Sequence, residues 1–175
     1  MKIEVVPYNS LWPAQFESER SALLAGLGNI IDHVHHIGST AIRGLSAKPV
    51  IDIIIEVQSF ALLDRATSKL ETMGYEAMGE FGIAGRRYFR KGGVYRTHQI
   101  HAIRTGDVHV MRHLAFRDYL AAHPSVMEDY GLLKMKLAAD CNDDLDEYCN
   151  GKDPFIKTHE SRALEWKRRL TGDCR

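Results

Sequence analysis

Hydrophobic positions divide the first third of the chain into one helical stretch and two β-rich stretches. Apolar residues within 10–27 recur at helical spacing, and Gly28 is expected to end that helix. Residues 29–37 are rich in Ile, Val and His, which favours a strand. Residues 49–57 give the strongest strand signal, because a nearly continuous β-branched run is typical of a segment buried on both faces of a sheet.

The remaining segments change from mixed to purely helical character. Residues 62–73 have helical spacing, and the Gly-punctuated stretch 75–103 contains two predicted strands, 86–90 and 94–103. Three helices are then predicted, at 108–122, 125–139 and 155–170. This order predicts an α/β (α+β) fold: a mixed β-sheet flanked by helices, with a helical C-terminal third.

Length and charge narrow the function classes. A chain of 175 residues with 45% hydrophobic residues is expected to form one domain, 1–175, around one core. Lys and Arg number 23, as do Asp and Glu, whereas a protein that coats duplex nucleic acid would be strongly basic. Nucleic acid is therefore disfavoured as a partner, while the charge balance still allows a small-molecule ligand.

Cysteine usage and hydropathy indicate a cytoplasmic protein. The three cysteines are odd in number and lack C-x-x-C spacing, which argues against a disulfide scaffold and against a cysteine zinc site. No apolar run is long enough for a membrane span, so no membrane partner is expected. Nothing in the sequence indicates an oligomeric state.

A Gly-Ser turn and one carboxylate carry the candidate chemistry. Gly38, Ser39 and Thr40 follow a predicted strand, and such a turn offers backbone N–H groups and hydroxyls to an anion. Asp52 lies inside the apolar run 49–57, where a lone carboxylate is costly unless it is paired or metal-bound. We therefore expect a functional site here; the alternative is that Asp52 is a capping or ion-paired residue at the sheet end.

Several segments in order carry a family resemblance: His36–Ala41, Gly44–Leu45, Ala47–Asp52, Gly85–Lys91, Arg96–His101 and Arg112–Leu120. With these segments the chain resembles the GrpB family of the nucleotidyltransferase superfamily. The resemblance spans most of the chain and implies a nucleotidyltransferase-like fold for the single domain.

The chain departs from the superfamily pattern at its second carboxylate. That pattern is Asp-x-Asp or Asp-x-Glu, which holds two Mg²⁺ ions, whereas Ile54 stands at the second position here. The neighbouring predicted strand offers Gln99 and His101 in place of a third carboxylate. We therefore expect one divalent ion (Mg, Mn or Zn), held by Asp52, His101 and His36, with Asp52 and His101 as the catalytic residues.

Positive charge gathers in the segments around this site. Arginine forks match phosphate oxygens, so a phosphorylated or nucleotide ligand is the expected partner. The alternative is a solvated hairpin whose cations pair with Glu80 and Asp107. The residues predicted to bind phosphate are Gly38, Ser39, Thr40, Lys48, Arg86, Arg87 and Arg117.

The function predicted from these features is metal-dependent nucleotidyl or phosphoryl transfer on a small nucleotide-like substrate. The turn would hold phosphate oxygens, Asp52 the ion, and Lys48 and Arg86 would neutralise charge. A non-catalytic nucleotide- or phosphate-binding or folding-support module is the first alternative, and Ile54 favours it. A metal-dependent hydrolase, favoured by the many histidines, is the second, so the sequence leaves open whether the protein is an enzyme.

Overall fold

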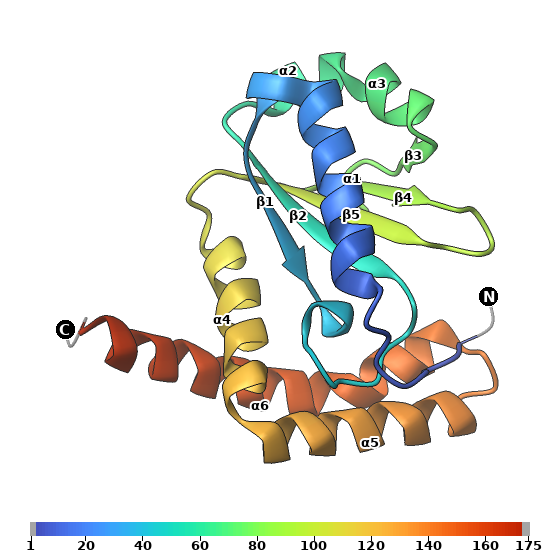
Figure 1. The fold of residues 1–175 in the computed structure, drawn as a ribbon, viewed down its shortest axis with the longest axis vertical. Helices are drawn as coiled ribbons and strands as arrows, with labels where there is room; N and C mark the ends of the chain where they lie inside the picture. The colour runs from blue at the N-terminus through green and yellow to red at the C-terminus, as the bar shows by residue number, and fades with distance from the viewer. Residues whose placement is uncertain (1–2, 173–175) are drawn as a thin grey trace.

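A five-stranded mixed sheet forms the centre of the molecule (Figure 1). The computed structural model describes residues 3–172. The strand order is β1-β2-β5-β4-β3; β2 and β5 pair in parallel, and the other neighbours pair antiparallel. The strands are β1 (Ile31–Ile37), β2 (Ile51–Val57), β3 (Tyr75–Ala77), β4 (Arg87–Lys91) and β5 (His98–Arg104).

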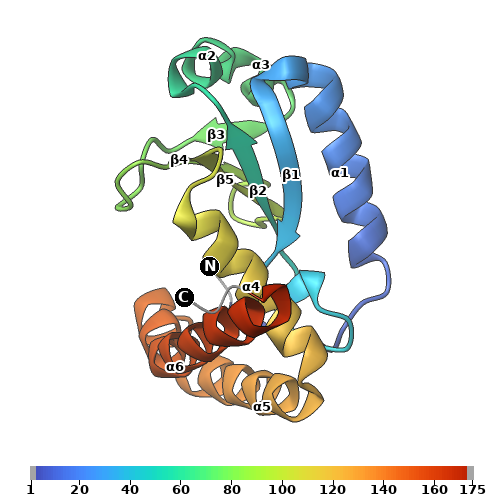
Figure 2. The same cartoon turned by 90° about the vertical axis from the view of Figure 1, so that its left-hand side faces the viewer.

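Helices cover both faces of the sheet, as Figures 1 and 2 show. On one face the core joins α1 (Trp12–Leu27), α2 (Phe60–Arg65) and α3 (Thr67–Thr72) to the strands. On the other face α4 (Val108–Ala122) packs on β2 and β5. Helices α5 (Pro124–Asp140) and α6 (Leu145–Thr171) cross beneath the end of the sheet where β2 begins.

Alternation along β2 decides which side chains reach which layer. Ile53 and Ile55 face the α1 side, where they are fully buried in the larger core cluster. Asp52, Ile54 and Glu56 face the α4 side, where Ile54 joins a smaller cluster. The α4 face of β2 therefore carries its two carboxylates.

The mixed sheet and the helical last third agree with the sequence prediction, and helix 108–122 has the predicted bounds. Several details differ. The helix expected at 62–73 is two helices joined at Ala66, the short strand β3 was not predicted, and the strand expected at 94–103 begins only at His98. Helix α6 begins at Leu145 and runs through Pro154.

The early start of α6 has a local cause. The Asp144 side chain caps the helix by accepting hydrogen bonds from the backbone N–H groups of Asp146 and Glu147. Tyr148 and Ala163 are buried on either side of Pro154, so packing offsets a proline cost of about 3 kcal/mol inside a helix. The first two turns of α6 therefore reach the end of the sheet.

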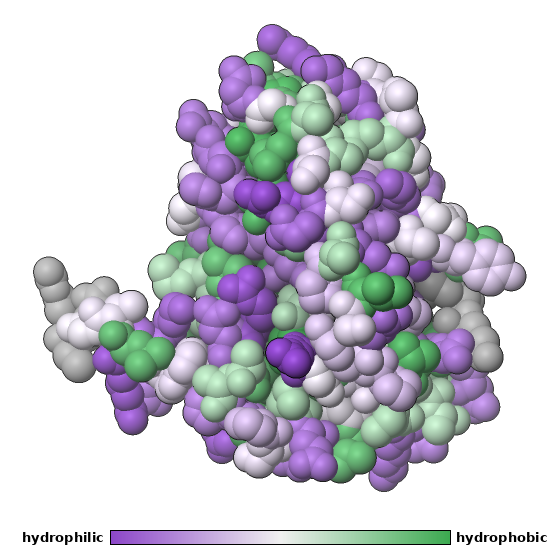
Figure 3. All heavy atoms as spheres, in the orientation of Figure 1, coloured by the Kyte–Doolittle hydropathy of each residue, from purple (hydrophilic) through white to green (hydrophobic). Residues whose placement is uncertain are grey.

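No helix within residues 3–172 combines the length and apolar character needed to cross a bilayer. Figure 3 shows hydrophilic and hydrophobic side chains interspersed over the drawn face.

Candidate functional site

A cavity of about 180 Å³ lies where β2 begins, between the β1–β2 connection and helices α5 and α6. The connection starts with the short 3₁₀ helix η2 (Ser39–Ala41). The polar and charged lining comprises Ser39, Thr40, Lys48, Asp52, Gln99, Lys134, Tyr148, Cys149 and Lys152. The cavity thus combines the predicted turn and carboxylate with side chains from two helices. We call it the β2 cavity.

Asp52 is the second residue of β2 and packs against the backbone of Gly38. Gly38 has a φ of 70°, and a Cβ there would lie 2.6 Å from Asp52 Oδ2, so no other residue fits without displacement. With its amide oriented to satisfy both polar atoms, Gln99 donates to Asp52 Oδ1 at 3.0 Å and accepts from Arg96 at 3.2 Å. Burial raises the pKa of Asp52 to about 7, although Lys152, Lys48 and Arg96 oppose the shift.

Lys134 is a buried cation held by neutral oxygens. Its residue is 2% exposed, and Nζ lies 2.7 Å from Ser39 Oγ and donates to the Ser46 carbonyl at 2.5 Å. Nζ also lies 4.6 Å from the centre of the Tyr130 ring. Burial and the charge of Lys152 lower the pKa of Lys134 to about 7. Within residues 3–172 no carboxylate pairs with this ammonium group, so its charge lacks a local counter-ion.

Lys48 and Lys152 add two more ammonium groups to the lining. Burial lowers the pKa of each, and Asp52 acts in the opposite direction on both. The Lys152 ammonium also lies 4.1 Å from the centre of the Tyr148 ring. Three ammonium groups therefore line a cavity with one carboxylate.

Thr40 fixes the turn instead of offering its hydroxyl to the cavity. It is 1% exposed, and its hydroxyl donates to the Val50 carbonyl at 3.1 Å. Because that proton is used, the hydroxyl accepts from His36 Nε2, which lies 3.1 Å away. Ser39, Lys48 and Asp52 line the cavity as the sequence predicted, with Gly38 behind Asp52 and Thr40 in a supporting position.

The structure does not bring His36 to Asp52, which corrects its predicted place among the metal ligands. His36 pairs with Ile53 in the β1–β2 register and therefore lies on the opposite face of the sheet from Asp52. Its ring stacks on Phe16 of α1, with the ring centres 4.6 Å apart. Burial, followed by Arg117, lowers the pKa of His36 to about 4.

His101 lies on the same face as Asp52 but further along the sheet. It pairs with Ile54, whereas Asp52 pairs with Gln99. His101 Nδ1 lies 3.1 Å from Arg86 Nη1, and both residues line a second cavity instead of the β2 cavity. In the described part of the chain, no group of three or more His, Cys, Asp or Glu side chains is placed to hold a metal ion. The predicted ligand set is therefore not assembled.

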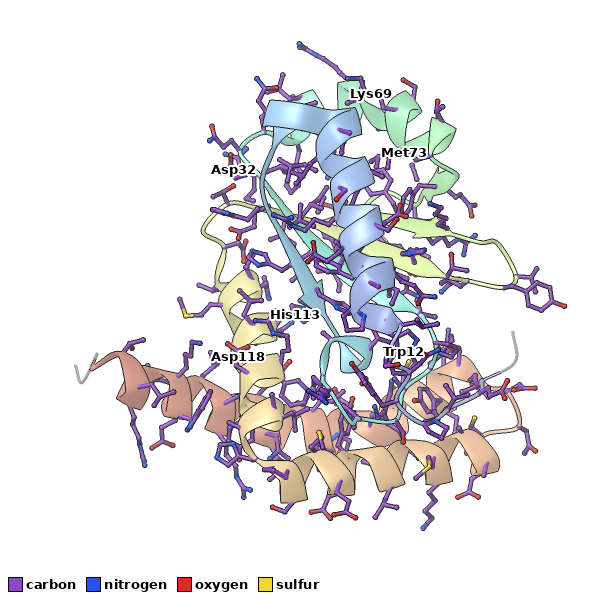
Figure 4. The ribbon with its side chains drawn as sticks, in the orientation of Figure 1. Trp12, Asp32, Lys69, Met73, His113 and Asp118 are labelled. Carbon is purple, nitrogen blue, oxygen red and sulfur yellow. The ribbon has the colours of Figure 1, made fainter. Side chains whose placement is uncertain are left out.

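Arg87 and Arg117 also lie outside the β2 cavity lining. Arg87 pairs with Asp64 at 2.9 Å on the α2 side. Arg117 donates to the His36 carbonyl at 2.9 Å and pairs with its neighbour Asp118 at 2.8 Å; Figure 4 labels Asp118 on α4. Both arginines therefore tie helices to the sheet.

The sequence prediction missed Lys134 and Lys152. One signal for Lys134 was present: Tyr130, Lys134 and Leu137 share one face of a helix, so a lysine stands in an apolar stripe. Lys152 precedes the helix predicted at 155–170, so no face could be assigned to it.

Comparisons with known proteins identify the family. The sequence model of the family described as GrpB protein matches residues 2–162. UPF0157 protein YqkA of Bacillus subtilis is 45% identical over 167 residues, which cover 95% of this chain but 49% of YqkA. The chain thus spans about half of that relative's length.

Solved structures extend the comparison. The crystal structure of conserved protein GrpB from Enterococcus faecalis is 42% identical and matches with a TM-score of 0.90, covering 94% of this chain and 99% of that one. The structure of Cid1 with its short product ApU covers 74% of this chain and 41% of its own, with 10% identity and a TM-score of 0.49. That likeness is too distant to bear on activity. The family match and the relative in Enterococcus faecalis show that the chain belongs to the GrpB family.

Proposed function

We propose that the β2 cavity binds the phosphate groups of a small, nucleotide-like molecule. The observation that carries this proposal is Lys134, a buried ammonium group that contacts neutral oxygens at Ser39 and Ser46. Burial lowers the pKa of Lys134 to about 7 because a buried cation without a counter-ion is costly, and an anionic ligand stabilises its protonated form. At an effective dielectric constant of about 20, a unit negative charge about 4 Å away contributes about 4 kcal/mol of attraction.

The charge balance of the lining favours an anionic ligand. Among the described residues, Lys134 and Lys152 line the cavity beside a single carboxylate, that of Asp52. Phosphate oxygens are strong acceptors, and ammonium groups bind them as point charges. The Ser39 hydroxyl lies beside Lys134 and can donate to the same phosphate.

A larger groove supports the nucleotide-like character of the ligand. It has a volume of about 660 Å³ and shares Lys48 and Val50 with the β2 cavity. Pro49, Val94 and Tyr95 give it an apolar and aromatic lining, and Tyr95 is 88% exposed. An aromatic face of this kind can stack on a planar base while the phosphates occupy the smaller cavity.

The metal ions implied by the superfamily pattern do not fit the donor set. Asp52 is the one carboxylate in the lining, and the adjacent same-face position is the fully buried Ile54. Gln99 turns its amide nitrogen, a donor, toward Asp52. A two-ion site needs several carboxylates or equivalent oxygen ligands. The lining therefore does not suit metal-dependent transfer, and the phosphate-binding module is the better supported of the functions predicted from the sequence.

Thermal unfolding with pyrophosphate and ATP tests the proposal. Both ligands should raise the melting temperature of the wild type in a saturable way, because a ligand that binds only the native state stabilises it. Lys134→Met keeps the aliphatic stem but removes the charge, and it should abolish both shifts. Lys136→Met, at an exposed position on the same helix, is the matched control and should keep them. Equal shifts in Lys134→Met and wild type, or no shift in the wild type, would contradict the proposal.

A further inference from the structure

A second, smaller cavity lies on the same face of the sheet, between β5, the loop before β4 and helix α4. Its volume is about 30 Å³. The polar side chains that line it are Arg86, His101, His109, Arg112 and His113. Figure 4 labels His113 on α4, the helix that packs against this face. Among the residues described, the lining contains cationic and imidazole groups but no carboxylate.

Arg86 supplies a buried charge to this cavity. The residue is 7% exposed, and its guanidinium donates to the carbonyls of Glu80 and Phe81 at 2.8–3.3 Å and contacts His101 at 3.1 Å. Those contacts use four of its five N–H groups and leave one on Nη1. No carboxylate between residues 3 and 172 forms an ion pair with Arg86, so its charge is met only by neutral groups, including the Tyr88 ring, whose centre lies 4.9 Å from the guanidinium carbon.

The two buried imidazoles add donors. A guanidinium can only donate, so His101 Nδ1 accepts from Arg86, and the ring proton lies on Nε2. The His113 ring centre lies 6.3 Å from that of His101. Burial and neighbouring cations lower the pKa of His101 to about 3 and that of His113 to about 4. Both rings are therefore neutral near pH 7, and each keeps one N–H group.

Two carboxylates approach the rim, but neither lines the cavity. Glu80 is exposed and accepts from the Gly85 N–H at 2.9 Å. Glu160 on α6 lies 3.7 Å from Arg112 Nε, beyond hydrogen-bond distance, and this Nε is buried without a partner in the described structure. The positive charge at Arg86 therefore stays without a carboxylate partner of the protein's own.

We infer that this second cavity binds the carboxylate group of a small molecule, independently of the β2 cavity. The second cavity is small, with about 30 Å³ against about 180 Å³ for the β2 cavity, so it favours a compact anionic group such as a carboxylate over the bulkier phosphate. The remaining Arg86 N–H and the imidazole N–H groups are donors of the kind that carboxylate oxygens accept.

Formate is the probe, because it is a carboxylate with almost no further bulk. Its dissociation constant is measured by ¹³C NMR titration at constant ionic strength, with chloride and phosphate as competitors. The wild type should bind formate saturably, and phosphate at equal concentration should not displace it. Two replacements, His113→Phe and His113→Asn, should each weaken binding at least tenfold, so the test stands if one of them fails to fold. His33→Phe, at an exposed strand position, is the control and should bind as the wild type does.

The outcomes separate this inference from the proposed function. Lys134→Met should bind formate normally even though it loses pyrophosphate binding. Formate affinity that is unchanged in a folded His113 variant, or absent in the wild type, would overturn the inference. Equal competition by chloride would overturn it as well, because the cavity would then bind monatomic anions without selecting a carboxylate.

Discussion

Replacing Gly38 by alanine places a methyl group against the Asp52 carboxylate. Gly38 has φ 70° and ψ −172°, a backbone region that costs other residues about 1–3 kcal/mol. The new Cβ would lie 2.6 Å from Asp52 Oδ2 and 3.1 Å from Asp52 Cβ, and overpacking of this kind costs a further 1–3 kcal/mol or so. The free energy of unfolding should therefore fall by about 2–6 kcal/mol.

A second glycine separates the two contributions. Gly28 has φ 55°, and a Cβ there would meet no atom within 4 Å, so Gly28→Ala tests backbone strain alone. Urea unfolding at pH 7 should show that Gly38→Ala costs more than Gly28→Ala, and that Asp52→Ala reduces the excess in a double-mutant cycle, because it removes the carboxylate contact and leaves only the contact with Cβ. Equal costs for the two glycine variants, or an excess of the same size without the Asp52 carboxylate, would refute the reasoning.

Two further predictions concern the same end of the sheet. The folded-state pKa of Asp52, about 7, is above its ordinary value of 3.8, so the unfolded state loses its proton first, and the contribution of Asp52 to stability should fall as pH rises from about 4 to 7, by at most about 1.4 kcal/mol per pH unit. The lowered pKa values of His36, His101 and His113 act in the opposite direction over the same range. Urea unfolding should therefore show the stability of Asp52→Asn rising more steeply with pH than that of the wild type; an identical pH dependence in both proteins would contradict the raised pKa of Asp52. Thr40→Val breaks the bonds to the Val50 carbonyl and to His36 and should cost about 1–3 kcal/mol in the same assay, whereas Thr72→Val, at an exposed hydroxyl, should cost less than about 1. Similar costs for the two threonines would remove Thr40 as the anchor of the turn.

Local pattern was enough to predict the turn at residues 38–40 and the buried strand β2. The β-branched run identified the buried strand, and period-two alternation placed Asp52 and Ile54 on one face and His36 on a face different from that of His33 and His35. Alternation alone could not show which face of the predicted strand 29–37 adjoins Asp52. That depends on the antiparallel register, in which Ile37 pairs with Asp52.

The positions of His101, Lys134 and Lys152 depend on contacts between segments far apart in sequence. The parallel register of β2 and β5 sets Gln99, not His101, beside Asp52. The packing of α5 and α6 beneath the sheet brings both lysines to the β2 cavity, 82 residues or more from Asp52 in the chain. Sequence spacing alone does not determine strand register or helix packing of this kind.

A crystal structure of the protein with pyrophosphate tests the central claim most directly. The account predicts electron density for the ligand in the β2 cavity, with phosphate oxygens about 2.7–2.9 Å from Lys134 Nζ and further contacts to Lys48 and Lys152. Density in that place should be lost in Lys134→Met crystals grown under the same conditions. Pyrophosphate bound elsewhere, or an empty β2 cavity at saturating concentration, would contradict the account.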